Sequence, residues 1–222
     1  MENKTVDYLR FSLTDRCNLN CIYCTPLEKG QFLARSEVLT YEEIARVVSL
    51  FVKAGISRLR LTGGEPLLKK DIVSLVGMLK NIDGLEEISL TSNGVYLKDL
   101  AFGLKDAGLS RVNISIDTLK KEKFKGITGF DLFDDVWSGV LRSIEAGLNP
   151  VKLNVILMKG INDDELFDFV RLTFEYPLIV RFIEFFPTNK RSMKFAGYLV
   201  RSDDVKTRIA GHFRDYAKRF AD

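Results

Sequence analysis

Hydrophobic and polar positions change their period repeatedly along this chain, and the change predicts alternating strands and helices. Residues 8 to 14 alternate between the two classes, which predicts a strand. A capping box, Thr40 to Glu43, then precedes apolar residues that recur at helical spacing from Ile44 to Phe51. Gly55 stands where a helix C-terminal cap belongs. The first strand is therefore expected to be followed by a helix.

The same alternation continues to the end of the chain. The further expected strands are residues 58–62, 87–91, 111–116, 151–158 and 179–185. The expected helices are residues 72–79, capped by Asp71, then 97–107, 132–146 and 163–174, with a basic amphipathic helix from Ser202. Six strand–helix units predict an α/β fold with a parallel sheet and outer helices. A closed eight-unit barrel needs about 250 residues, so we expect a partial (βα)6 barrel.

The composition is that of one globular domain. Of the 222 residues, 46% are hydrophobic and 28% are charged, and no linker divides the chain. We expect the barrel to span residues 5–190, followed by a short helical tail at residues 191–222. The net charge of +3 is too small to indicate a nucleic-acid surface. Because no signal peptide or apolar run of membrane length is present, we expect a cytoplasmic protein without a membrane partner. The sequence leaves homodimer formation open.

All three cysteines fall in one short segment, Cys17-x-x-x-Cys21-x-x-Cys24. Thiolates this close usually hold a metal, and three can fix three corners of an iron–sulfur cube while one iron stays open to a small molecule. A structural zinc site would need a fourth ligand, and the only histidine, His212, is distant in sequence. A disulfide would leave an odd thiol, and a thioredoxin-like Cys21–Cys24 pair would leave Cys17 without a role.

Turn-forming and reactive residues follow each predicted strand, and in parallel βα folds these positions share one face. Gly63 and Gly64 lack a Cβ, so a ligand can approach their backbone amides. Hydroxyl and amide groups at Thr91, Asn93 and Ser115 could bind sugar or carboxylate oxygens. Tyr23 could pack against a flat base, or belong to the core. Four cations lie on predicted strands: Arg10, Arg60, Lys152 and Arg181. They would form an anion site if they point inward, and the alternative is that they face the outer helices and form ion pairs there.

These motifs together resemble the radical SAM superfamily. The cysteine segment with an aromatic residue before its last cysteine, followed by Gly63-Gly64-Glu65-Pro66, is the signature of that superfamily. Within it, the chain is most similar to the GTP 3′,8-cyclase family of molybdenum cofactor biosynthesis, over roughly residues 5 to 190. The runs Thr14 to Asn18, Asn113 to Asp117 and Lys159 to Asp163 carry this closer match.

The resemblance implies a lyase that uses a [4Fe–4S] cluster to cleave S-adenosyl-L-methionine to a 5′-deoxyadenosyl radical. GTP would be the substrate, and a reducing partner would donate the electron. The implied metal ligands are Cys17, Cys21 and Cys24. The implied S-adenosylmethionine contacts are Tyr23, Gly63, Gly64, Glu65, Ser115 and Phe186. The implied GTP contacts are Arg10, Arg60, Thr91 and Lys152, with Arg181 as a catalytic residue.

Two departures from the family pattern stand out. The family carries a second cysteine triplet whose cluster binds guanine, and this sequence has neither that triplet nor a terminal pair of glycines. Phe186 stands where the family often has methionine. The chain could therefore be a truncated piece or a paralogue with another substrate, and a module that binds S-adenosylmethionine without cleaving it is a further alternative. We expect weak GTP binding with little discrimination against ATP.

Overall fold

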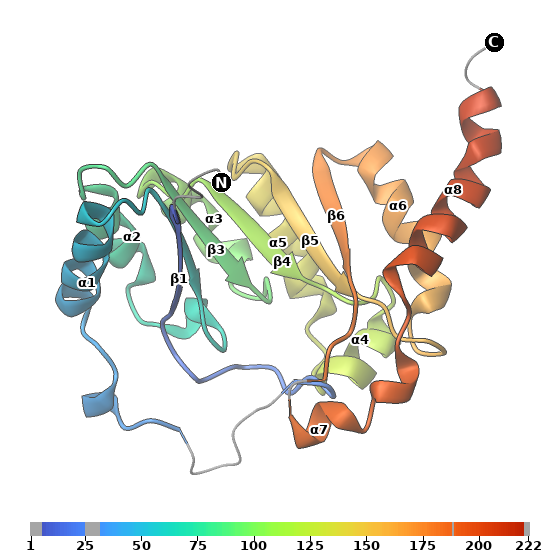
Figure 1. The fold of residues 1–222 in the computed structure, drawn as a ribbon, viewed down its shortest axis with the longest axis horizontal. Coiled ribbons are helices and arrows are strands. Elements are labelled where there is room, and N and C mark those ends of the chain that lie inside the picture. The colour runs from blue at the N-terminus through green and yellow to red at the C-terminus, as the bar shows by residue number, and fades with distance from the viewer. Residues whose placement is uncertain (1–5, 25–31, 188, 220–222) are drawn as a thin grey trace, which may run out of the picture.

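Six parallel strands form one sheet in the computed structural model of the chain, which describes residues 6–24, 32–187 and 189–219. The strands pair in the order in which they occur, from β1 to β6, and no closure of β1 onto β6 exists among the described residues. Figure 1 shows the strands side by side with α3 and α5 behind the middle of the sheet. The bounds are β1 Tyr8–Ser12, β2 Arg58–Thr62, β3 Glu87–Ser92, β4 Arg111–Ser115, β5 Val151–Ile156 and β6 Leu178–Ile183.

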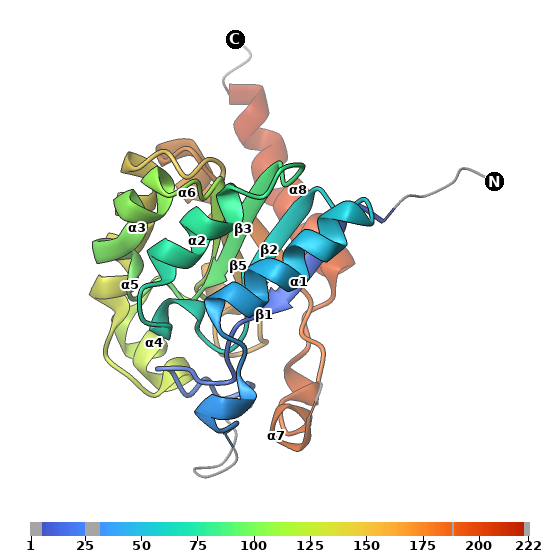
Figure 2. The same cartoon turned by 90° about the vertical axis from the view of Figure 1, so that its left-hand side faces the viewer.

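Helices connect consecutive strands and cover one face of the sheet (Figure 2). Those between strands are α1 Tyr41–Lys53, α2 Ile72–Lys80, α3 Leu97–Asp106, α4 Lys121–Thr128, α5 Phe133–Glu145 and α6 Leu166–Glu175. After β6 come α7 Lys190–Met193 and α8 Ser202–Arg219, and short 3-10 turns occupy Arg35–Glu37, Pro66–Leu68, Asp163–Glu165 and Ala196–Tyr198. The predicted α/β partial barrel with six parallel strands is confirmed.

Local sequence signals account for most of the element boundaries. The capping box is confirmed, because the Thr40 hydroxyl accepts from the Glu43 amide at 3.2 Å and the Glu43 carboxylate accepts from the Thr40 amide at 2.8 Å. Asp71 was expected to cap α2 and does not. It adopts a left-handed conformation with φ 56° and makes no capping hydrogen bond. Helix α4, within the segment between β4 and β5, was not predicted from the sequence at all.

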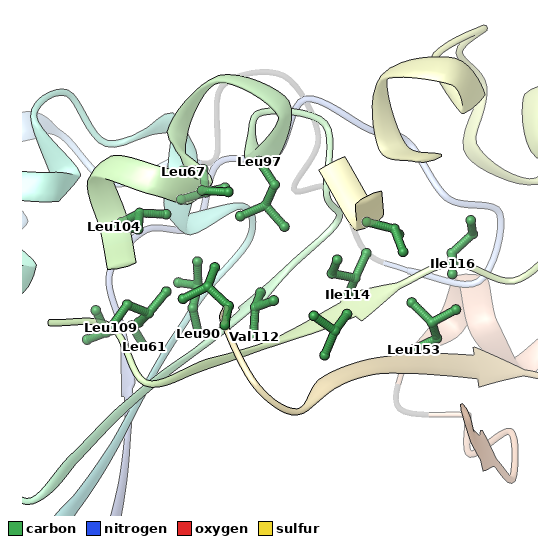
Figure 3. Close-up of a cluster of buried hydrophobic side chains, with 14 of the residues drawn as sticks. Leu61, Leu67, Leu90, Leu97, Leu104, Leu109, Val112, Ile114, Ile116 and Leu153 are labelled. Atoms are coloured by element: carbon green, nitrogen blue, oxygen red, sulfur yellow. The ribbon is translucent and has the colours of Figure 1, made fainter. Parts of the chain in front are cut away.

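The core lies between the sheet and its helices. Alternate strand residues, such as Leu61, Leu90, Val112, Ile114 and Leu153, are almost completely buried against the helices (Figure 3). Because side chains of a strand alternate between its two faces, the intervening residues point to the other side of the sheet. We call this second side the open face.

The C-terminal segment packs on the same core. Val200 and Val205 belong to the buried cluster formed by the sheet and helices. The division of the chain at residue 190 stays a prediction. None of the helices in the described residues is long and apolar enough to cross a membrane.

Candidate functional site

The cysteine segment leaves the carboxyl end of β1 and is held in place by backbone hydrogen bonds. The Asn20 amide donates to the Thr128 carbonyl and the Ile22 amide donates to the Ile127 carbonyl, both at 2.9 Å. Both acceptors belong to the end of α4. The unpredicted helix therefore fixes one side of the cysteine loop, residues 13–24.

The three thiols are all free and differ in exposure. Cys17 and Cys24 are exposed and Cys21 is partly buried. The Leu19 amide and the Asn93 side-chain amide donate to Cys17 Sγ at 3.5 and 3.8 Å. Burial raises the pKa of Cys17 and of Cys21, and the Asp117 carboxylate and the other two thiols raise the pKa of Cys21 further. Protons must therefore leave these sulfurs when a metal binds.

Three free thiols are a donor set for an iron–sulfur cluster. Among the described residues, no three His, Cys, Asp or Glu side chains are grouped to hold one metal ion. The thiols are nevertheless close enough to act on one another's pKa. An iron–sulfur cluster binds each thiolate through a different iron, so its ligands stand apart from one another. This donor set fits a [4Fe–4S] cluster with one iron not bound by the protein.

Gly63 and Gly64 allow the loop after β2 to pack directly on the cysteine loop. A Cβ on Gly63 would lie 2.4 Å from the Thr14 carbonyl oxygen, and one on Gly64 would lie 2.2 Å from the Arg16 carbonyl oxygen. The Gly64 amide also donates to the Thr14 carbonyl at 2.7 Å. The sequence suggested that these glycines expose amides to a ligand. In the structure they bring two backbones together, and their contact with S-adenosylmethionine stays a prediction.

Glu65 ties the same loop to the end of β3. Its side chain is 0% exposed and accepts from the Leu67 amide at 3.0 Å, the Ser92 hydroxyl at 2.8 Å and the Asn93 amide at 2.7 Å. Burial raises the pKa of Glu65 against the opposing effect of these hydrogen bonds. Both carboxylate oxygens are therefore used within the protein, and the role of Glu65 as a cofactor ligand stays a prediction.

Tyr23 is anchored by a buried carboxylate at the end of β4. Its hydroxyl donates to Asp117, and its ring meets Phe185 edge to face with centroids 6.1 Å apart. The other Asp117 oxygen accepts from the Ile156 amide at 2.8 Å. Burial raises the pKa of Asp117 to about 6. Asp117 thus joins the cysteine loop to the end of β5.

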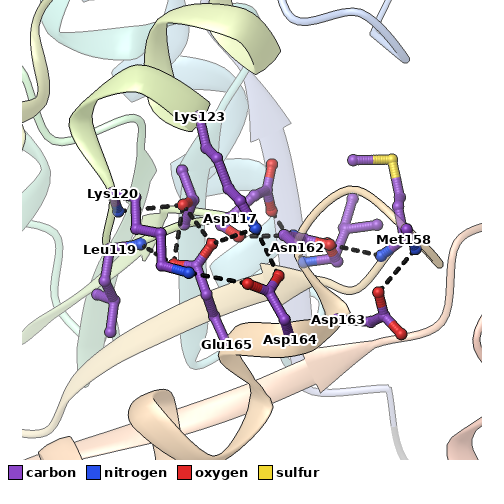
Figure 4. Close-up of polar contacts among 12 residues, drawn as sticks. Asp117, Leu119, Lys120, Lys123, Met158, Asn162, Asp163, Asp164 and Glu165 are labelled. Atoms are coloured by element: carbon purple, nitrogen blue, oxygen red, sulfur yellow. Dashed lines mark hydrogen bonds and ion pairs between the residues drawn. The ribbon is translucent and has the colours of Figure 1, made fainter.

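A second buried side chain continues this connection into the loop after β5. Asn162 is 0% exposed, donates to the carbonyls of Asp117 and Ile156 at 2.6 and 2.8 Å, and accepts from the Met158 amide at 2.7 Å (Figure 4). Nearby, Glu165 accepts from the Thr118 hydroxyl at 2.7 Å. These contacts join the loops after β4 and β5 to each other.

Arg191, which the sequence did not single out, holds the cysteine loop from the far end of the chain. Its guanidinium donates to the Ile22 carbonyl at 2.9 Å, to the Asn20 side chain at 2.8 Å and to the Asn20 carbonyl at 3.2 Å. A planar guanidinium suits such a forked contact. Only the three-dimensional arrangement reveals this role, because α7 lies 169 residues from Ile22.

A hollow of about 360 Å³ adjoins the last cysteine. Its lining includes Cys24, Tyr23, Ile156 and Phe186, and Phe186 is 80% exposed. Two residues expected to contact S-adenosylmethionine, Tyr23 and Phe186, therefore share one surface with a cysteine. Ser115 is exposed at the end of β4, and its register partner on β5 is Asn154.

The four strand cations all lie on the open face. Arg10 pairs in register with Arg60, and Arg181 pairs with Asn154, at positions that alternate with core residues. Burial lowers the pKa of Lys152, and the charges of Arg111, Arg181 and Arg60 lower it further. The same two causes lower the pKa of Arg60. The inward orientation considered from the sequence is thus observed, and the outward one is wrong.

Arg111 adds a further cation to this face, although it was treated only as the start of a strand. It forms an ion pair with Glu87 at 2.6 Å. Thr91, an expected substrate contact, accepts weakly from the Asn113 side-chain amide at 3.5 Å. Like charges crowd this face, so an anion bound there would relieve their repulsion.

The comparisons with known proteins agree with this arrangement. A family model described as the radical SAM superfamily matches residues 11–173. Proteins named GTP 3′,8-cyclase are 46% identical in Heliobacterium modesticaldum and 49% identical in Moorella thermoacetica, each over 207 residues. These matches cover 93% of this chain but 63% and 64% of the relatives, so the chain spans less than two thirds of their length.

Solved structures show the same fold at low sequence identity. Streptococcus suis SuiB bound to S-adenosylmethionine matches 95% of this chain and 48% of that chain, with a TM-score of 0.72 and 14% identity. HydG, a maturase of the [FeFe]-hydrogenase, matches 90% of this chain and 47% of that chain, with a TM-score of 0.64 and 20% identity.

Proposed function

The chain belongs to the radical SAM superfamily, and on that premise we propose that it carries out the GTP 3′,8-cyclase step of molybdenum cofactor biosynthesis. The superfamily uses a [4Fe–4S] cluster and S-adenosylmethionine. The reaction and its substrate come from relatives that are longer than this chain. The observation that carries the proposal is the meeting of three free thiols and a cationic open face on one parallel sheet.

The cysteine loop would hold the cluster through Cys17, Cys21 and Cys24. A bound, reduced cluster supplies the electron that cleaves S-adenosylmethionine and starts radical chemistry. The protein itself fixes the loop, through the contacts of Arg191, Asp117 and α4 described above. The hollow beside Cys24 would take the adenosine part, with Tyr23 and Phe186 at its wall and Ser115 near the ribose.

The open face would bind the triphosphate of GTP. Arg10, Arg60 and Lys152 can make charge-assisted hydrogen bonds to phosphate oxygens, and such bonds do not depend on the base. Arg181, on the same face and nearer the carboxyl ends of the strands, would act on the reacting part of the substrate. Thr91 would contribute a hydroxyl from the row between those of Arg60 and Arg181.

Anaerobic reconstitution followed by product analysis tests the proposal. The chain should bind about four irons and absorb near 400 nm (roughly, as thiolate-to-iron bands do), and Cys21→Ala should lose both properties. Dithionite-reduced protein should then release 5′-deoxyadenosine, and addition of GTP with the electron donor should give the cyclic product. Zinc without iron would contradict the cluster assignment. Cleavage without any effect of GTP would favour a paralogue, and binding without cleavage would favour a non-cleaving module.

A further inference from the structure

The open face carries four buried polar atoms without a protein partner. Among the described residues these atoms are Tyr8 Oη, Arg111 Nε, Asn113 Oδ1 and Asn154 Oδ1. All four side chains stand at strand positions that alternate with core residues. Native proteins pair nearly all buried polar groups, because a buried group left unpaired has lost its hydrogen bonds to water without gaining others. Four such atoms on one face indicate a surface built to receive a ligand.

Asn113 is the most deeply placed of the four. Its side chain is 0% exposed, and its amide nitrogen makes only a 3.5 Å contact with the Thr91 hydroxyl. Asn113 stands in register between Thr91 on β3 and Lys152 on β5. Its oxygen is therefore a buried acceptor at the centre of the open face, beside a cation.

The register sets the order of chemical groups along the open face. Arg60, Ser89 and Arg111 form one row, two residues toward the amino ends of the strands from Asn113. Ser115, Asn154 and Arg181 form another row, two residues toward the carboxyl ends and the cysteine loop. Two residues of strand span about 6.6 Å. The neutral acceptor thus lies between a cationic row and the cysteine end of the site.

This order specifies the kind of ligand that fits. An amide oxygen can only accept, so the ligand must present a donor such as a hydroxyl group to Asn113. Three cations, Arg10, Arg60 and Arg111, lie on the side away from the cysteine loop, against Arg181 on the other side, so the greater positive charge favours an anion on the side away from that loop. A phosphorylated sugar has both groups in this order, with its hydroxyls between the phosphate and the end where the reaction starts.

We propose that Asn113 accepts a hydrogen bond from a ribose hydroxyl of the nucleotide and so orients the sugar between the cationic row and the cysteine loop. The inference rests on the proposed function, since it assigns a further contact in the same site. Asn113 is a substrate-orienting residue in this scheme, and it discriminates by the sugar rather than by the base.

A cycle of ligands and variants tests this assignment by calorimetry on the 222-residue chain at low salt. The ligands are inorganic triphosphate, GTP, 2′-deoxy-GTP and 3′-deoxy-GTP. The wild-type chain should bind GTP about tenfold more tightly than one of the deoxynucleotides. Asn113→Leu should bind GTP and that deoxynucleotide equally. Its affinity for inorganic triphosphate should stay within twofold of the wild-type value. Asn81→Leu, the same change at the exposed C-terminal end of α2, should keep the preference.

The outcomes separate this inference from the proposed function. Equal binding of GTP and both deoxynucleotides by the wild-type chain would overturn the role of Asn113. Binding of inorganic triphosphate in the same experiment would still support the anion site of the proposed function. This comparison needs no variant and stands even if Asn113→Leu does not fold. A preference that survives Asn113→Leu, or is lost equally in Asn81→Leu, would also overturn it. If the wild-type chain binds no polyphosphate, this inference and the proposed substrate fail together.

Discussion

The Tyr23 hydroxyl donates a hydrogen bond to the buried Asp117 carboxylate, and the two residues are 94 positions apart in the chain. The contact joins the last part of the cysteine loop to the end of β4. Because Asp117 is buried, its charge state affects the stability of the whole site.

Asp117→Asn should remove a pH-dependent loss of unfolding free energy. Burial raises the pKa of Asp117 from its ordinary 3.8 to about 6, so the folded state holds a proton that the unfolded state has lost. The wild-type chain therefore loses stability as pH rises from about 4 to 6.5. Relative to it, the variant should gain on the order of 3 kcal/mol over that range, measured by urea unfolding at a series of pH values.

Asp164→Asn is the matched control for that titration. Ion pairs with Lys120 and Lys123 lower the pKa of Asp164 to about 2, so its contribution is present at higher pH and is lost only as pH falls toward that value. Its difference from wild type should stay flat from pH 5 to 8. A flat difference for Asp117→Asn as well would show that this carboxyl titrates normally.

Gly64→Ala should displace the cysteine loop. The new Cβ would lie 2.2 Å from the Arg16 carbonyl oxygen, and relief requires movement of backbone. We expect a loss of about 1–3 kcal/mol in unfolding free energy and poorer iron incorporation. Gly77→Ala in α2 has open space around its Cβ and should gain about 0.5–1 kcal/mol. Normal iron content in Gly64→Ala would show that the loop tolerates the shift.

Arg191→Met should loosen the cysteine loop without touching a sulfur. The variant loses three hydrogen bonds to Asn20 and Ile22, while the apolar stem of the side chain is retained. We expect destabilisation of about 1–3 kcal/mol and faster amide exchange in residues 18–24. Arg171→Met, which breaks an exposed ion pair with Asp168, should change stability by less than about 0.5 kcal/mol. Unchanged amide exchange in the loop would show that the Arg191 hydrogen bonds do not hold it in place.

Lys152→Met should stabilise the chain while weakening anion binding. Burial and neighbouring arginines lower the pKa of Lys152, so its charged form is disfavoured in the folded state at neutral pH. The variant should therefore unfold at higher temperature than the wild type in the absence of ligand. Added inorganic triphosphate should raise the melting temperature of the wild type more than that of the variant. The opposite order would place the lysine outside the anion site.

Most of the fold could be predicted from the sequence, because hydrophobic period and capping residues are local signals. The bounds of β2 and the box at Thr40 illustrate this. Helix α4 escaped prediction because it has only two hydrophobic residues, Phe124 and Ile127, both of which are buried. The prediction for Asp71 was wrong because aspartate is a common N-cap residue, whereas here its left-handed backbone conformation goes with no capping hydrogen bond from its side chain.

The candidate site was predictable where one residue type carries the chemistry, as in Cys17, Cys21 and Cys24. The supporting contacts were not, since they join distant segments. Nothing near Arg191 in the sequence indicates that it binds Asn20, and nothing near Glu65 indicates that it binds the amide of Asn93. Asn113 looks like any strand residue until the register shows what surrounds it.

The reach of the Arg191 contact also bears on how the protein matures on the ribosome. Residues 20 and 22 are synthesised early, and the guanidinium that fixes them is made 169 residues after Ile22. At about 5–20 residues per second, translation leaves an interval of roughly 10–30 s between the two. During that interval the thiols already exist but the loop lacks its final clamp. The described shape of the loop is therefore complete only after residue 191 has been synthesised.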